Sequence, residues 1–286
     1  MFRNNNTIDK TQIYNNIYPG LMGVITLTTD FCSGSEYPAA MKGVLLKINP
    51  EIRIIDITHS IKAHNVPQGA YILYSVVPYF ENAIHLGVVD PGVGTARAGL
   101  IFQCHSGVFV GPDNGLLYPA AERLGIISVY KITNQEYYLK EVSFTFHGRD
   151  IFAPIAAHLS KGKSPDEVGE PVDEFEKLDL FDFKETKDTI QGRVLNIDTF
   201  GNIIMNVPKD VLGKILIKND GKNIKVDCNG QTWSLPFKET YGSVSPGKLL
   251  SLISSSGFLE LAGNQCNASE ILNIKINDDV TIKKGI

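Results

Sequence analysis

The sequence lacks the features that mark several large classes of protein. It has no excess of basic residues, because 27 lysines and arginines against 31 aspartates and glutamates leave a formal net charge of −4, and no Lys/Arg cluster forms a local basic patch. This balance argues against general nucleic-acid binding. No hydrophobic run approaches the length of a membrane span, and the polar first residues contain no apolar core of a signal peptide. We therefore expect a small-molecule ligand, with no nucleic-acid or membrane partner.

Cysteine is also scarce. The four cysteines, Cys32, Cys104, Cys228 and Cys266, are far apart, and none of them has the short paired spacing of a zinc site. Reduced thiols in a cytoplasmic protein are the simplest interpretation. The remaining composition, with 43% hydrophobic residues and 26 glycines among 286 residues, is typical of a soluble globular protein, and the length favours two domains.

The first half of the chain alternates strand and helix patterns. Apolar, β-branched runs over residues 21–31, 52–61 and 83–89 are separated by stretches with helical spacing over residues 35–48 and 65–80. Further short apolar runs follow over residues 99–104, 107–111 and 126–132, with helical patterns over 116–124 and 145–157. Such alternation predicts an α/β domain with a mainly parallel sheet flanked by helices.

The second half has a different pattern. Between residues 162 and 188 the composition shifts to Pro, Asp, Glu and Lys, and after residue 190 short strand-like runs are divided by Gly, Asn, Asp and Pro. We predict a disordered extension over 1–20, an α/β catalytic domain over 21–175, a linker over 176–189, and a smaller all-β, barrel-like domain over 190–286.

Several polar side chains follow directly after predicted strands. The run AIHLGVVDPGVG, residues 83–94, is apolar until it reaches Asp90-Pro91-Gly92, and Arg97 follows closely. Asp30 ends an earlier strand in the same way. Ligands bind at the carboxyl edge of open α/β sheets, so Asp90 is a candidate for chemistry, although Asp-Pro also starts turns.

The ends of these strands and loops together offer Asp30, Asp90, Arg97, Asp113, Asn114 and His147. Carboxylates, a guanidinium and an imidazole suit a metal site, acid/base catalysis or recognition of a polar ligand, and the residue types do not decide among these. Asp150, near the start of a predicted helix, is expected to complement the helix dipole.

Six motifs in order make the pattern specific. They are TTDF with Asp30, DITH with His59, VVDPGVGTAR with Asp90 and Arg97, GPDNGLL with Asp113 and Asn114, TFHGRDIFAP with His147, and IDTFGN with Asp198, Phe200 and Asn202. From about Met22 to the C-terminus, the chain resembles the S-adenosyl-L-methionine hydroxide adenosyltransferase family, which is related to fluorinases and chlorinases. The family's fold, an α/β domain joined to a β-barrel, agrees with the periodicity above.

The resemblance implies hydrolysis of S-adenosyl-L-methionine to adenosine and L-methionine, with no metal or other cofactor. It implies that Asp90, Arg97 and His147 are the catalytic set that positions and activates water for in-line attack on the ribose C5′. The sulfonium is already a good leaving group, whereas water, with a pKa of about 15.7, has to be activated. The sequence leaves open which of the three residues takes the proton.

The implied substrate-binding residues are Asp30, His64, Asn114, Asp198, Phe200 and Asn202. Asp30 matches the position that holds the ribose hydroxyls, because a carboxylate can accept from both. Asp198 and Asn202 match positions at the methionine end, with Phe200 packing between them, and residues 254–267 align loosely with the adenine side. The family also implies a homotrimer with its sites at subunit interfaces.

Two alternatives belong to other classes. One is a metal-dependent phosphohydrolase that uses Asp30, Asp90, Asp113 and His147, which loss of activity on chelation would favour. The other is a non-catalytic protein that binds S-adenosyl-L-methionine or adenosine, which binding without turnover would favour. Neither of them calls for Arg97 beside Asp90 together with the C-terminal IDTFGN segment.

Halogenation is not expected. In the halogenating relatives, Tyr, Tyr and Ser occupy the positions of Asp90, His147 and Gly148. An anionic Asp90 would repel a buried halide. The span between Arg97 and Gly111 is also too short for the extra loop that halogenases carry there.

Overall fold

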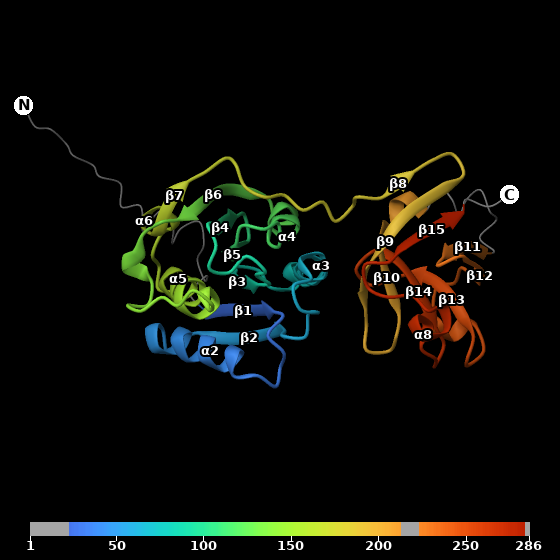
Figure 1. Cartoon of the computed structure of the whole chain (residues 1–286), viewed down its shortest axis with the longest axis horizontal. Coiled ribbons are helices and arrows are strands. Elements are labelled where there is room, and N and C mark those ends of the chain that lie inside the picture. Colours follow the sequence, from blue (N-terminus) through green and yellow to red (C-terminus); the bar gives the residue numbers. More distant parts are fainter. Residues whose placement is uncertain (1–22, 213–222, 284–286) are drawn as a thin grey trace, which may run out of the picture. The chain divides into compact units, whose positions relative to one another are not determined.

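A computed structural model of the protein describes residues 23–212 and 223–283. The chain divides into two compact units, one ending at Leu178 and the next beginning at Asp179 (Figure 1). This boundary lies inside the predicted linker, whereas the predicted extension over residues 1–20 lies outside the described residues. Among the residues described, no helix is both long and apolar enough to cross a membrane.

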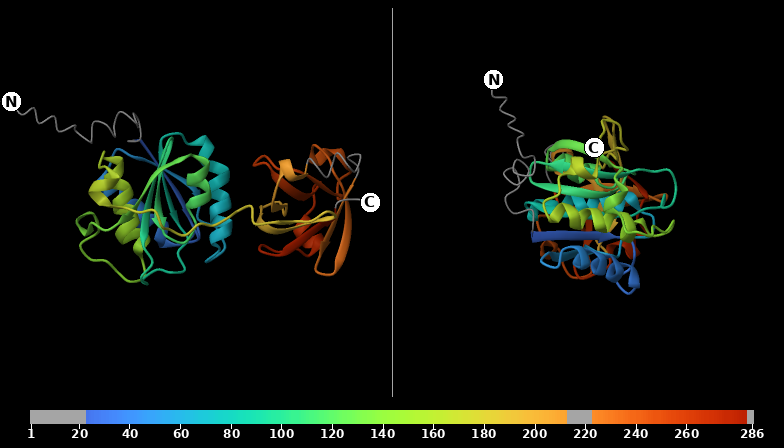
Figure 2. Two further views of the ribbon diagram at one scale, coloured as in Figure 1. Left: turned by 90° about the horizontal axis from the view of Figure 1, so that it is seen from above. Right: turned by 90° about the vertical axis from the view of Figure 1, so that its left-hand side faces the viewer.

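The first unit contains a seven-stranded mixed sheet between two layers of helices (Figure 2). The strand order is β2-β1-β3-β5-β4-β6-β7, with parallel pairing from β2 to β5 and antiparallel pairing from there to β7. The strands are β1 (Val24–Thr29), β2 (Arg53–Thr58), β3 (Ala83–Val88), β4 (Gly99–Cys104), β5 (Gly107–Pro112), β6 (Ile126–Ile132) and β7 (Gly169–Pro171). The predicted α/β class is confirmed. The sheet is mixed because the connection between β4 and β5 is too short for a parallel crossover.

Helices cover both faces of this sheet. Helices α2 (Glu36–Ile48) and α5 (Ala153–Ser160) pack on one face, where Met41 and Leu45 join Ile25 and Leu27 in a buried core. On the other face lie α3 (Val66–Val76) and α4 (Tyr118–Arg123). The predicted helix over 65–80 ends as a short 3₁₀ turn at Val77–Tyr79, which contains Pro78, a residue without a backbone N–H to donate. A short helix, α6 (Pro165–Val168), leads into β7.

The second unit is an antiparallel, nearly closed barrel-like sheet. Its strand order is β12-β11-β15-β9-β10-β14-β13, with β8 paired to β9. The strands are β8 (Lys184–Glu185), β9 (Thr189–Ile197), β10 (Ile203–Pro208), β11 (Asn223–Cys228), β12 (Gln231–Pro236), β13 (Leu249–Ile253), β14 (Phe258–Gly263) and β15 (Asp279–Lys283). A bridge between Phe237 and Ser251 brings the end of β12 to β13, and one short helix, α8 (Ala268–Leu272), follows β14. The predicted barrel-like all-β architecture is therefore confirmed.

Candidate active site

The strand β3 places Asp90 at the carboxyl edge of the parallel part of the sheet. Every residue of β3 is buried, and the chain turns immediately after it, where Val93 N–H donates to the Asp90 carbonyl oxygen. Gly94 completes the turn at a φ of 77°, and a Cβ there would collide with the carbonyl oxygen of Phe144. The turn therefore requires glycine, and it returns the chain so that Arg97 faces Asp90.

Arg97 binds both Asp90 and His147. Its Nε donates to Asp90 Oδ1 at 2.9 Å, and its Nη2 donates both to Asp90 Oδ2 and to His147 Nδ1, the latter at 2.9 Å. The Arg97 and Asp90 side chains are only 12% and 5% exposed. The guanidinium carbon also lies 5.0 Å from the centre of the Phe152 ring. The three predicted catalytic residues are thus one hydrogen-bonded cluster, whose charge-assisted contacts fix their mutual geometry.

The hydrogen bond from Arg97 determines the protonation state of His147. An arginine side chain has donors only, so His147 Nδ1 must accept, and in the neutral ring the hydrogen then sits on Nε2. Burial lowers the pKa of His147, and the charge of Arg97 lowers it further, against opposing effects of Asp90 and Asp150. His147 therefore stays a neutral imidazole with an N–H donor on Nε2.

Asp150 anchors the segment that carries His147. His147 precedes a π-helical turn, Gly148–Phe152, in which Asp150 is fully buried. The Asp150 carboxylate accepts hydrogen bonds from Ser143 N–H and Ser143 Oγ, both at 2.8 Å, and from Arg149 Nε at 2.6 Å. Burial alone would raise the pKa of Asp150, but these hydrogen bonds outweigh it and hold the pKa below its usual value. Asp150 therefore fixes the segment before His147 through its hydrogen bonds to Ser143. The sequence had predicted only an interaction with the helix dipole.

Asp30 and His64 meet at the same edge of the sheet. Asp30 follows β1, and its Oδ2 accepts the His64 backbone N–H at 2.8 Å. His64 has a φ of 65°, a left-handed conformation that the hydrogen bond to Asp30 helps to hold. Next to them His59 is buried, with Nδ1 hydrogen-bonded to Thr29 Oγ1 at 2.8 Å and Nε2 3.0 Å from Asp56 Oδ1.

Asn114 and Asp113 support the strand ends. Asn114 Nδ2 donates to the Val89 carbonyl oxygen at 2.8 Å, so it holds the backbone next to Asp90. Asp113 Oδ1 accepts from Glu176 N–H at 2.8 Å. Among the described residues, no three His, Cys, Asp or Glu side chains gather as potential metal ligands. The four residues of the phosphohydrolase alternative each bind a protein group instead: Arg97 binds both Asp90 and His147, and backbone N–H groups bind Asp30 and Asp113.

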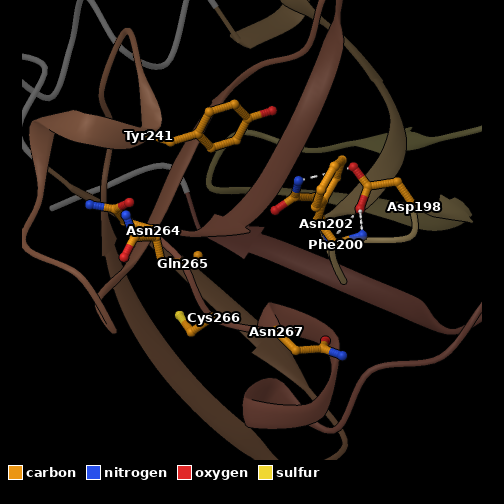
Figure 3. A pocket seen from close by; sticks show the side chains of 9 residues that line it. Asp198, Phe200, Asn202, Tyr241, Asn264, Gln265, Cys266 and Asn267 are labelled. Carbon is orange, nitrogen blue, oxygen red and sulfur yellow. Dashed lines mark hydrogen bonds between the residues drawn. The ribbon is translucent and has the colours of Figure 1, made fainter.

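The second unit has a pocket of about 620 Å³ lined by the predicted residues of the IDTFGN motif (Figure 3). Asp198 Oδ1 accepts the backbone N–H groups of Phe200 and Asn202, and Oδ2 accepts from Asn202 Nδ2, all at 2.9 Å. Asp198 therefore fixes the turn that carries Phe200 and Asn202. Because the backbone is held in this way, the Phe200 side chain is 77% exposed and lines the pocket instead of packing inside the unit.

Sequence reasoning missed Tyr241, the second ring of this pocket. Tyr241 is 43% exposed, and its hydroxyl donates to Glu260 Oε1 at 2.8 Å. Glu260 is 4% exposed, and burial raises its pKa, with a further contribution from the charge of Asp198. No strand or motif pattern singled out Tyr241, because it lies in a short 3₁₀ turn at Tyr241–Ser243.

Two further features complete the pocket. Asn202 Oδ1 is buried and has no hydrogen-bond partner among the residues that the structure describes. Residues 263–267, inside the stretch that the sequence aligned loosely with the adenine side, form another part of the wall. The pocket therefore combines two aromatic rings with a buried acceptor that lacks a donor.

Comparisons with known proteins agree with these motifs. Residues 25–169 match the model of the SAM hydroxide adenosyltransferase N-terminal domain, and residues 192–281 match that of the C-terminal domain. The chain is 39% identical over 276 residues to the (R)-S-adenosyl-L-methionine hydrolase of Methanocaldococcus jannaschii, covering 92% of this chain and 96% of that protein. A fluorinase from an Actinoplanes species is 28% identical over 294 residues, covering 92% and 98%. A crystal structure of a conserved protein from Thermotoga maritima superposes with a TM-score of 0.84 at 37% identity, covering 91% of this chain and 99% of that one.

Proposed function

The chain belongs to the S-adenosyl-L-methionine hydroxide adenosyltransferase family, and from this premise we propose that it hydrolyses S-adenosyl-L-methionine to adenosine and L-methionine. The observation that carries the proposal is the buried Asp90–Arg97–His147 cluster at the carboxyl edge of the sheet. A relative named as a hydrolase of the same compound, 39% identical over nearly its whole length, supports it.

The hydrogen bonds of the cluster support a distinct role for each group. Arg97 has no acceptor, and the His147 ring donates from Nε2, so Asp90 is the member able to take a proton from water. His147 Nε2–H donates to the water oxygen and holds it toward C5′. Arg97 holds both partners and offsets the charge of Asp90, which has both oxygens bound to the guanidinium.

The reaction is a balanced displacement at C5′. The water oxygen bonds to C5′ while the C5′–S bond breaks, and the bonding pair goes to sulfur, which neutralises the sulfonium and releases methionine. One water proton passes to Asp90 and the other stays on the new 5′-hydroxyl. No acid is needed for the leaving group, so activation of water is the whole catalytic task.

The two ligand-binding regions suit different parts of the substrate. Asp30 offers a carboxylate to the ribose hydroxyls. The pocket of Phe200 and Tyr241 suits a flat base, because the rings supply stacking surfaces and the unpartnered Asn202 Oδ1 needs a donor such as an exocyclic amine. The family resemblance assigns Asp198 and Asn202 to the methionine end instead, and the two placements predict different binding data.

Finer features extend the proposal. We propose that catalysis needs no metal and that the active unit is a homotrimer, in which each site takes residues from neighbouring subunits. The family resemblance supports this proposal, and the proposed ligand-binding residues lie in both units of the chain. Dispersed free thiols suit a reducing compartment such as the cytoplasm. The Asp90 carboxylate offers only acceptors, so it suits water, which can donate a hydrogen bond to it, better than a halide.

Incubation of the protein with S-adenosyl-L-methionine in the presence of EDTA tests the function. We expect adenosine and methionine in equal amounts, with chromatography and mass spectrometry as the readout. Loss of activity with EDTA that added metal restores would favour the phosphohydrolase alternative. Tight binding without any product would favour the non-catalytic one.

A further inference from the structure

Glu260 is a buried carboxyl group in the second unit that no step of the proposed reaction uses. It lies in β14, where the two neighbouring strands place Ile204 and Leu252 directly opposite it, and all three residues are 4% exposed. Residues that lie opposite one another on paired strands share one face of the sheet. A carboxylate between two aliphatic side chains costs free energy that a leucine would not. Packing alone therefore does not account for a glutamate at this position.

The hydrogen bond that Glu260 accepts comes from Tyr241. The Tyr241 hydroxyl lies 2.8 Å from Glu260 Oε1, and among the described residues this is the one hydrogen bond of either side chain. Burial and the neighbouring carboxylate raise the pKa of Tyr241, so the hydroxyl keeps its proton and is the donor. A hydrogen bond to an ionised acceptor is roughly twice as strong as one between neutral groups. The ionised form of Glu260 therefore holds the Tyr241 ring most firmly.

The Tyr241 ring belongs to a turn outside the strands of the barrel. It begins the 3₁₀ turn Tyr241–Ser243, is 43% exposed and forms one side of the pocket lined by the IDTFGN motif (Figure 3). Glu260, by contrast, lies in a strand that is paired on both sides. The hydrogen bond thus ties a ring at the surface to the sheet. A ring that is already held in place avoids the loss of side-chain entropy that a mobile ring incurs when a ligand binds.

The charges around Glu260 determine the pH at which it takes up a proton. Burial raises the pKa of Glu260, the hydrogen bond from Tyr241 opposes this rise, and the charge of Asp198 adds to it. Ile204 and Leu252 on the neighbouring strands carry no charge, and no lysine, arginine or histidine in the described part of the chain affects this pKa. Glu260 therefore takes up a proton at a higher pH than an exposed glutamate, and its hydrogen bond to Tyr241 weakens as the pH falls through that pKa.

We propose that Glu260 is a positioning residue of this pocket, and that its carboxylate holds the Tyr241 ring in the orientation that binds the ligand. The inference rests on the proposed function, because it takes S-adenosyl-L-methionine as the ligand. It holds for either part of the substrate, the base or the methionine end, because it concerns the wall of the pocket. Glu260 itself does not line the pocket and acts through the Tyr241 hydroxyl.

The test measures ligand binding and stability in the same set of variants. Glu260→Leu removes the acceptor, Glu260→Gln keeps an uncharged acceptor, and Tyr241→Phe removes the donor but keeps the ring. The matched control is Glu239→Gln, which changes an exposed carboxylate in the same segment as Tyr241. Each change is made in a His147→Ala parent, which is expected to bind S-adenosyl-L-methionine without turnover. Calorimetry gives the Kd from about pH 5 to 8, on either side of the pH range in which a raised glutamate pKa falls.

The expected result is a loss of affinity that depends on the hydrogen bond. At about pH 8, Glu260→Leu and Tyr241→Phe should each raise the Kd for S-adenosyl-L-methionine by about two- to tenfold, the effect of ordering one side chain on binding. The double variant should lose little more than either single variant, because both changes break the same bond. The Kd of the parent should rise as the pH falls, and Glu260→Gln, which cannot titrate, should show a smaller rise. Titration of the ligand affects both proteins alike, and Glu239→Gln should match the parent.

Stability separates positioning from a structural role. Glu260→Leu removes a buried carboxylate from apolar surroundings, so without ligand it should unfold at the same or a higher temperature than the parent, although it binds more weakly. Weaker binding with an equal loss of stability, additive losses in the double variant, an unchanged Kd, or a parent that does not bind S-adenosyl-L-methionine would overturn the inference. A protein that shows the expected binding pattern, but whose wild type forms no adenosine, would contradict the proposed function alone.

Discussion

At the scale of single residues, one guanidinium organises the proposed chemistry. Arg97 contacts both oxygens of Asp90 and the Nδ1 of His147, so the protonation of the ring follows from the chemistry of arginine. The sequence motifs predicted the membership of this cluster. They could not predict which group takes the proton, because that depends on which ring nitrogen faces Arg97.

Removal of any member of the cluster should slow catalysis far more than it weakens binding. We expect Asp90→Asn, Arg97→Ala and His147→Ala each to lower kcat by ~10²–10⁴-fold, the usual loss for an acid/base or electrostatic group. Calorimetry with adenosine, a ligand without the reacting bond, should show a nearly unchanged Kd. An exposed carboxylate variant, Asp173→Asn, is the control, and lost adenosine binding with full turnover at saturation would remove these residues from the reaction.

Ligand affinities distinguish which part of the substrate, the base or the methionine end, binds in the pocket lined by the IDTFGN motif. Asp30→Ala should weaken S-adenosyl-L-methionine and adenosine alike, by roughly one to two decades for a lost charge-assisted hydrogen bond. If the pocket holds the base, Asn202→Ala should also weaken both ligands equally. If it holds the methionine end, as the resemblance implies, Asn202→Ala and Asp198→Ala should leave adenosine binding almost unchanged. Competition binding with both ligands decides between them.

At the scale of helices and strands, periodicity predicted most elements but not their pairing. The stretch over residues 35–48 became α2, and the run after Ala83 became β3, because each has one dominant apolar pattern. In the first unit, the antiparallel half of the sheet depends on the two-residue connection between β4 and β5. In the second unit, β12 has little apolar alternation that could reveal a strand. The sequence predicted only a helix-dipole role for Asp150, because its hydrogen-bond partner Ser143 is brought near by a loop.

A buried histidine in β3 should make the first unit sensitive to acid. His85 is 1% exposed, its Nδ1 is hydrogen-bonded to Thr26 Oγ1, and burial lowers its pKa to about 3. The unfolded chain takes up this proton near pH 6.5, but the folded protein does not until about pH 3. The contribution of neutral His85 to the free energy of unfolding is therefore complete above pH 6.5, and it is lost progressively as the pH falls from 6.5 to about 3.

Urea unfolding followed by circular dichroism between pH 4 and 7 measures this effect. The folded protein should lose about 1.4 kcal/mol per pH unit below pH 6 through this one proton. In His85→Gln, which cannot titrate, the pH dependence should be shallower by that amount. Parallel curves for the wild type and the variant would show that His85 does not stay neutral in the folded state.

At the scale of the whole molecule, each unit of the chain carries part of the proposed ligand-binding machinery. The proposed catalytic cluster and Asp30 belong to the first unit, and the pocket lined by the IDTFGN motif belongs to the second. Membership in the family leads us to propose a trimer with shared sites, and the sequence of one chain does not say whether the parts meet within or between subunits.

Mixing two inactive variants tests for shared sites. His147→Ala and Asp198→Ala, dissociated and reassembled together, should recover activity if a first unit of one subunit works with the second unit of its neighbour. Some interfaces between the two different variants then combine an intact first unit with an intact second unit. Mass spectrometry or differential tags must show that mixed oligomers formed, and mixed oligomers that stay inactive would place each site within a single chain.

The origin of the oxygen in the product tests the central claim most directly. The account predicts that the protein, given S-adenosyl-L-methionine in ¹⁸O-labelled water with EDTA, forms adenosine with one ¹⁸O atom at the 5′-hydroxyl and an unlabelled methionine, whereas the Asp90→Asn variant forms almost none. Adenosine without the label, a product cleaved at a bond other than C5′–S, or full activity of Asp90→Asn would contradict the account.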